Sequence, residues 1–201
     1  MRKALAFVIA GALALASVAA AAQAPTRIRG TVTGLDGNVL SLKSRDGKDL
    51  KVKLADNVTV SAAKSVALAD IKPGDFVGPA SRPGPDGKLV AISLQVFPAA
   101  LRGVVPEGHT PWDLEPGSMM TNAIVATVAQ APNGRELKLE YKGGTQTVVV
   151  PAGVPVFTTV PGDRSLLVPG ATIFTIARPG PDGALSSARI SVSKDGVRPA
   201  N

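Results

Sequence analysis

The chain has 201 residues, a formal net charge of +7 and no cysteine. This length accommodates one medium domain or two small ones. Without cysteine there is neither a disulfide nor a lipid-anchored lipobox cysteine, so a packed core must stabilise the protein. The 22 Lys and Arg and 15 Asp and Glu form no basic run longer than two residues, which indicates dispersed surface charge.

The first predicted element is a signal peptide at residues 1–24. A basic start precedes an uncharged, Ala-rich run at 4–22, and small residues then lead to a polar boundary. This layout is typical of secretory signals and predicts a periplasmic protein. Cleavage after Ala22 and cleavage after Ala24 both remain open, and a retained anchor helix is the alternative. No later apolar run is long enough to be a transmembrane helix.

Two copies of one β-rich unit follow, related by an offset of 96 residues. The matches at this offset are the identical hexapeptides 82–87 and 178–183, Pro73-Gly74 with Pro169-Gly170, Val58 and Val60 with Val154 and Val156, and Thr31-Val32 with Thr127-Val128. Repetition on this scale indicates a duplicated structural unit. We therefore predict a first β-barrel repeat at 25–97, an inter-repeat segment at 98–122, a second β-barrel repeat at 123–194 and a C-terminal tail at 195–201.

Apolar residues alternate with polar ones inside each copy, which is typical of half-buried strands. The expected core positions of the first copy are Ile28, Gly30, Val32, Leu40, Leu42, Leu50, Val52 and Leu54. In the last strand of each copy they are Val90, Ile92, Leu94 and Val96, and Ala188, Ile190 and Val192. Pairs such as Asp36-Gly37 and Asp86-Gly87 separate the strands and predict tight turns.

These patterns predict an all-β protein of two tandem small antiparallel β-barrels, OB-like, after a signal-peptide helix. A short helical turn is expected at residues 67–71. Each copy of about 70 residues is marginally stable alone, because a small domain buries a low fraction of its surface. We expect the copies to pack together or to share a strand, and which of the two remains open, as does the oligomeric state.

Three segments of the first copy carry a family resemblance. The strand Gly30-Thr31-Val32, the segment 71–77 (IKPGDFV) and the segment 86–91 (DGKLVA) resemble the small OB-like β-barrel repeat of exported bacterial proteins of unknown function. The second copy departs from this pattern, since Ala171 follows Pro-Gly where the first copy has Asp75, and Ser187 replaces Ala91. The resemblance implies the fold and an exported location, and it implies no activity.

The inter-repeat segment is where a ligand site is most expected. It contains the only His and the only Trp of the chain, and the candidate residues are Glu107, His109, Trp112, Asp113, Met119 and Met120. One interpretation is a small-ligand or metal pocket, with nitrogen, carboxylate and thioether donors that would suit Cu(I). The preferred interpretation is structural: Trp112, Leu114 and the methionines seal the seam between the barrels, and His109 and Asp113 hydrogen-bond to hold the loop.

Catalytic chemistry is not indicated by the sequence. The single histidine lies in no Gly-x-Ser-x-Gly context, and several acidic residues precede glycine as turn formers. No phosphate-binding Gly loop is present, so we assign no catalytic, cofactor-binding or metal residues and expect no cofactor. The aromatic content of 3% and the predicted export argue against nucleic acid as a partner. We expect a non-enzymatic binding or scaffold protein of the cell envelope, whose partner is an envelope protein or polymer.

Overall fold

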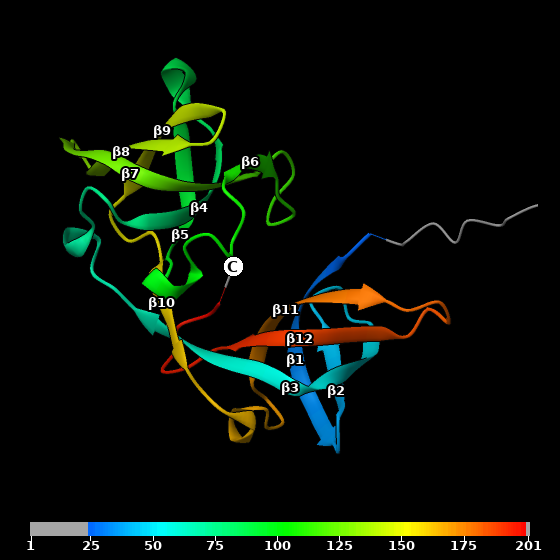
Figure 1. Ribbon diagram of the computed structural model, residues 1–201. Helices are drawn as coiled ribbons and strands as arrows, with labels where there is room; N and C mark the ends of the chain where they lie inside the picture. Colours follow the sequence, from blue (N-terminus) through cyan, green and yellow to red (C-terminus); the bar gives the residue numbers. More distant parts are fainter. Residues whose placement is uncertain (1–23, 200–201) are drawn as a thin grey trace, which may run out of the picture.

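The computed structural model describes residues 24–199, so the expected signal peptide lies almost wholly outside the described residues. Over this range the chain is all-β, and its twelve strands form one continuous network of pairings in two lobes (Figure 1). The all-β prediction is therefore confirmed. Among residues 24–199, no helix has the length and apolar character needed to cross a membrane.

The first lobe is a closed ring of five strands, in the order β1 (Thr26–Asp36), β2 (Val39–Ser44), β3 (Asp49–Ser65), β12 (Leu185–Val192) and β11 (Thr172–Pro179). Neighbours are antiparallel except for the parallel pair β3–β12, and β11 closes the ring against β1. The buried core is Ile28, Val32, Leu40, Leu42, Val52, Leu54, Val60, Leu167, Ile173, Ala177, Ile190 and Val192.

The second lobe repeats this ring with β7 (Met119–Ala131), β8 (Gly134–Tyr141), β9 (Gly144–Pro151), β5 (Leu89–Val96) and β4 (Phe76–Pro83). The parallel pair is here β5–β9, and β4 closes against β7. A short strand, β6 (Gly108–Pro111), pairs with the start of β7 outside the ring. The buried core is Ile71, Val77, Leu89, Ala91, Leu94, Ala123, Val125, Leu137, Leu139, Val148, Val150 and Val156.

Each lobe combines strands from both copies. The first lobe takes β1–β3 from the first copy and β11–β12 from the second, whereas the second lobe takes β7–β9 from the second copy and β4–β5 from the first. The expectation of one barrel per copy does not describe these pairings. The reason is the 17-residue length of β3, which continues beyond its own lobe and delivers the following strands to the other one.

The crossing strands pair with each other between the lobes. The end of β3 runs antiparallel to β10 (Val156–Pro161), and Ala63 lies opposite Thr159, a residue 96 positions later (Figure 1). The two copies therefore meet at equivalent positions and exchange strands reciprocally, as in a domain-swapped dimer joined into one chain.

The predicted alternation holds in the first three strands, where every expected core position is buried except Leu50, which is half-buried. In the last strands it fails before a shift in the pairing register and holds after it, where Leu94, Ile190 and Val192 are buried as predicted. Leu89 and Ala91 are buried in place of Val90 and Ile92, and Ser187 is buried while Ala188 is exposed. The cause is a register shift in each strand: Ile92 is skipped in the pairing of β5 with β4, and Ala188 is skipped in the pairing of β12 with β3. One extra residue reverses which side chains face the core from there on.

The hairpin that opens each copy differs in length. Val32 pairs with Leu42 in the first lobe, and Val125 pairs with Leu139 in the second, so the equivalence of β1 and β7 has an offset of 93 and not 96. Met119–Asn122, which we expected in the inter-repeat segment, are consequently the start of β7. The predicted helical turn is present as a 3-10 helix at Leu68–Asp70, with its counterpart at Arg164–Leu166.

Candidate functional site

The inter-repeat segment leaves the second lobe and returns to it. It forms β6, then the loop 112–118, and then joins β7. Ser118, which is buried, closes this loop: its hydroxyl donates to the carbonyl oxygen of Glu115 at 2.7 Å and lies 3.1 Å from that of Trp112. We call residues 112–118 the interlobe loop, because its side chains contact the first lobe.

Trp112 is the main contact of the interlobe loop with the first lobe. The guanidinium carbons of Arg27 and Arg29, both on β1, lie 4.2 and 5.4 Å from the indole centroid. The ring of Phe174 on β11 is 6.2 Å away at 50°. Arginine over an indole face is a favourable cation–π geometry. Among the described residues the buried indole Nε1 has no hydrogen-bond partner, so packing and cation–π attraction hold this side chain.

Polar contacts continue the same interface. Asp113 Oδ1 accepts a hydrogen bond from Arg29 Nη1 at 3.0 Å, and the Arg29 side chain is only 11% exposed. Arg45 donates to the carbonyl oxygen of Leu114 at 3.4 Å. Glu115 lies 3.8 Å from Arg82 of β4, so it holds the loop to the second lobe. Burial lowers the pKa of Arg29, while Asp113 opposes that change. Arg45 and Arg27 lower this pKa further, so three guanidinium groups influence one another here.

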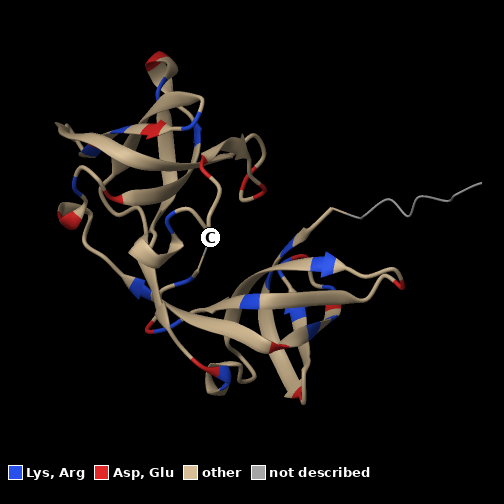
Figure 2. Cartoon of the chain, viewed as in Figure 1, with Lys and Arg blue, Asp and Glu red and all other residues tan. Residues whose placement is uncertain are grey.

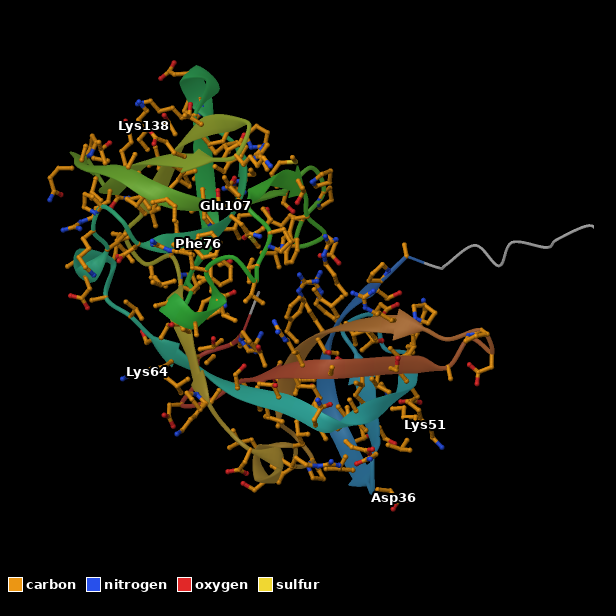
Figure 3. All side chains as sticks on the ribbon, viewed as in Figure 1. Asp36, Lys51, Lys64, Phe76, Glu107 and Lys138 are labelled. Atoms are coloured by element: carbon orange, nitrogen blue, oxygen red, sulfur yellow. The ribbon has the colours of Figure 1, made fainter. Side chains whose placement is uncertain are left out.

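Glu107 and His109 face a different neighbourhood, within the second lobe. His109 Nδ1 is 2.8 Å from the Thr121 hydroxyl, and its ring stacks on Tyr141 at 6.5 Å. Glu107 Oε2 accepts a hydrogen bond from the backbone N–H of Lys142 at 3.2 Å (Figure 3 labels Glu107). Burial lowers the pKa of His109, which favours the neutral imidazole.

The six candidate residues therefore divide into three places. Trp112 and Asp113 contact the first lobe, Glu107 and His109 contact the turn after β8, and Met119 and Met120 lie in β7 opposite Ser81 and Ala80 of β4. No three His, Cys, Asp or Glu side chains of residues 24–199 gather at metal-binding distance. The six residues therefore do not form one coordination sphere, and two of them, Trp112 and Asp113, form an interface between the lobes.

The partners of this interface were not predicted from the sequence. No role was assigned to Arg27, Arg29 or Phe174 from the sequence. The available signal was an aromatic residue and a carboxylate together in an unrepeated segment, Trp112 and Asp113, opposite a strand with two arginines on one face. Such a pattern indicates complementary chemistry but does not specify which strand is contacted.

Two shallow depressions of about 370 Å³ each lie away from the interlobe loop. One is beside the Lys88–Glu136 ion pair of the second lobe, whose atoms are 2.6 Å apart. The other lies on the outer face of β1, β2 and β3, between Thr33, Ser41 and Lys51. Neither depression contains a histidine or an aromatic side chain in its lining.

Comparison with protein-family models, with curated proteins and with solved structures finds no match for this chain.

Proposed function

We propose that the protein is an exported, non-enzymatic binding or scaffold protein of the cell envelope, in which two OB-like barrels are held in a fixed orientation. The observation that carries this proposal is the contact of Trp112 and Asp113 with Arg27, Arg29 and Phe174. The unrepeated segment between the two copies thus contacts both lobes. A fixed orientation of two surfaces is what a scaffold requires to engage a partner at two points.

The OB-like assignment is supported by the order of strands in each ring. Counting strands by their position in a repeat, both rings follow the order first, second, third, fifth and fourth, with a parallel third–fifth pair. OB-folds are small five-stranded Greek-key barrels whose outer faces and loops bind extended polymers. If the outer face of a barrel binds the ligand, the barrel core needs no functional groups.

The test is recovery of a partner from bacterial envelope extracts by the immobilised mature chain. We expect saturable recovery of a defined protein or polymer, and a weaker recovery by the variant Trp112→Ala, whose charge is unchanged. A matched variant, Val104→Ala, changes an exposed apolar residue outside the interface and is expected to behave as the wild type. Absence of any specific partner, or equal recovery by all three proteins, would contradict a scaffold with fixed lobes.

The alternative, a small-ligand or metal site around His109 and Trp112, is tested with the same preparation. Melting temperatures are compared with added Cu(I), Zn(II) or chelator. A metal that binds only the folded state raises the melting temperature. No shift with any of the three removes the metal hypothesis.

A further inference from the structure

The charges of the chain are divided unequally between the lobes. The first lobe, residues 24–65 and 163–199, has 13 Lys and Arg against 7 Asp and Glu, a balance of +6. The second lobe, residues 66–162, has 7 against 8, a balance of −1. In Figure 2, the Lys and Arg positions, coloured blue, lie on several strands of the first lobe. The positive balance of the mature chain is therefore a property of the first lobe alone.

Basic residues of the first lobe line up on the outer face of three neighbouring strands. Arg27 and Arg29 belong to β1, Lys43 to β2, and Lys51 and Lys53 to β3. The three lysines are exposed, and Figure 3 shows Lys51 directed away from the barrel. Asp49 of β3 lies opposite Lys43 on this face, but among the described residues no carboxylate is within ion-pair distance of Arg27 or of these lysines. The shallow depression beside Lys51 lies on this face.

The second lobe lacks this basic face although its fold is the same. The pairing registers make Met120 the equivalent of Arg27 and Glu140 the equivalent of Lys43. The equivalents of Lys51 and Lys53 are Thr147 and Val149. Because the barrel forms without these cations, they are not needed for folding, and the difference points to a ligand of the first lobe.

At one end of the basic face, arginines are crowded around the interlobe loop. Arg45 follows β2, and its backbone N–H donates to the carbonyl oxygen of Arg29. Arg27, Arg29 and Arg45 thus lie together, and Arg29 is paired with Asp113. Among the described residues neither Arg27 nor Arg45 forms an ion pair, so two positive charges lie beside the interlobe loop. Guanidinium groups bind phosphate with two parallel hydrogen bonds, which suits this place to a phosphate group.

We propose that the outer face of β1, β2 and β3 binds a linear polymer with repeated phosphate groups. One phosphate lies between Arg27 and Arg45, and the polymer continues over Lys43 and Lys51. Adjacent strands are about 4.8 Å apart, so the face spans about 10 Å from β1 to β3, enough for successive phosphates and more than one small anion needs. This inference deepens the proposed binding function and rests on it, because it names the class of ligand.

The experiment titrates the mature chain with inorganic polyphosphate at low salt and follows the fluorescence of Trp112, the only tryptophan, which lies against Arg27. We expect saturable binding that the double variant Arg27→Gln/Arg45→Gln weakens by about tenfold or more. Its plot of log K against log salt becomes shallower by about 1.4, for two lost phosphate contacts. Lys51→Gln/Lys53→Gln, on exposed positions, is expected to weaken binding too.

The matched control is Lys138→Gln/Lys142→Gln, which removes the same charge from exposed positions of the second lobe (Figure 3 labels Lys138). We expect its affinity to stay within about twofold of the wild type, since these residues belong to the second lobe and not to the basic face. Equal weakening by the control and by Arg27→Gln/Arg45→Gln would show that net charge alone decides, and would overturn the proposal. Melting curves of all variants verify that each is folded.

Other ligand classes give other outcomes. Binding to vesicles with anionic lipid but not to polyphosphate would assign the face to a membrane surface and overturn the proposal. Tighter binding of single-stranded oligothymidylate than of polyphosphate of equal charge would assign it to nucleic acid, with the same consequence. If polyphosphate does not bind but an envelope partner is recovered dependent on Trp112, the proposed function stands and this inference fails.

Discussion

The two lobes have the same strand ring but different surfaces and partly different cores. Both contain one parallel pair of strands and a register shift at equivalent residues, Ile92 and Ala188. In the first lobe, however, the buried hydroxyls of Thr175 and Ser187 hydrogen-bond at 2.7 Å, whereas the equivalent residues of the second are Pro79 and Ala91. The comparison shows that the barrel requires its register and this shift, while much else has diverged.

The reciprocal exchange of strands links the lobes despite this divergence. Neither lobe is complete within one copy, because β4 and β5 close the second lobe and β11 and β12 close the first. The crossing strands β3 and β10 also belong to the interface. The lobes are consequently expected to depend on each other for stability, which can be tested by separating or weakening them individually.

The largest expected effect is that of cutting the chain between Gly103 and Val104, an exposed position between the copies. Each fragment then contains three strands of one lobe and two of the other, so neither can close a barrel as a monomer. We expect the separate fragments to lack a folded monomeric state and an equimolar mixture to recover the native fold. Far-UV circular dichroism with size-exclusion chromatography measures this. A folded monomer of either fragment would show that a copy forms a barrel alone.

The second effect compares equivalent core residues of the two lobes. Leu40 and its counterpart Leu137 are fully buried, so each Leu→Ala change is expected to lower the free energy of unfolding by about 2–5 kcal/mol. Because β3 and β10 connect both lobes, we expect either variant to unfold in a single transition. Denaturant unfolding followed by circular dichroism measures both quantities. Two separated transitions, one of them unchanged from wild type, would contradict the dependence of one lobe on the other.

The sequence predicted the alternation within strands better than the pairing between them. Leu40 and Leu42 were identified as core because an apolar period of two requires only local information. The exchange of strands between the copies was not predictable in this way. Alternation does not show whether β4 pairs with the first strand of its own copy, β1, or with that of the other copy, β7. The residues around Ile92 give no sequence signal of the register shift. Trp112 was predicted at the seam between lobes, but its partners Arg27 and Arg29 are more than 80 residues away and look like a solvent face.

The third effect concerns the interlobe loop. Trp112→Ala removes the cation–π contacts and the packing on Phe174, and is expected to destabilise the protein by about 2 kcal/mol. Trp112→Phe retains an aromatic ring and removes the buried Nε1 group that lacks a partner among the described residues, so its cost is expected to be smaller. Urea unfolding followed by circular dichroism measures both changes. Equal stability of Trp112→Ala and wild type would mean that the loop does not hold the lobes together.

The smallest effect is the pH dependence from His109, which pairs with Thr121, the equivalent of the apolar Ile28 in the first lobe. Burial lowers the pKa of His109, so the unfolded chain binds this proton more readily than the folded protein. Its contribution to stability is complete above the unfolded pKa of about 6.5 and is lost as the pH falls from there through the folded pKa.

As the only histidine, His109 can be titrated by NMR without ambiguity. We expect a midpoint below about 6.5 in the folded protein, and a return toward that value on unfolding. His109→Gln is expected to lose less stability than the wild type between pH 7.5 and pH 5, because it has no imidazole to protonate. A midpoint above the unfolded value would mean that the surroundings of His109 favour the cation, in which case the second lobe has a charged group beside Thr121 where the first lobe has the apolar Ile28.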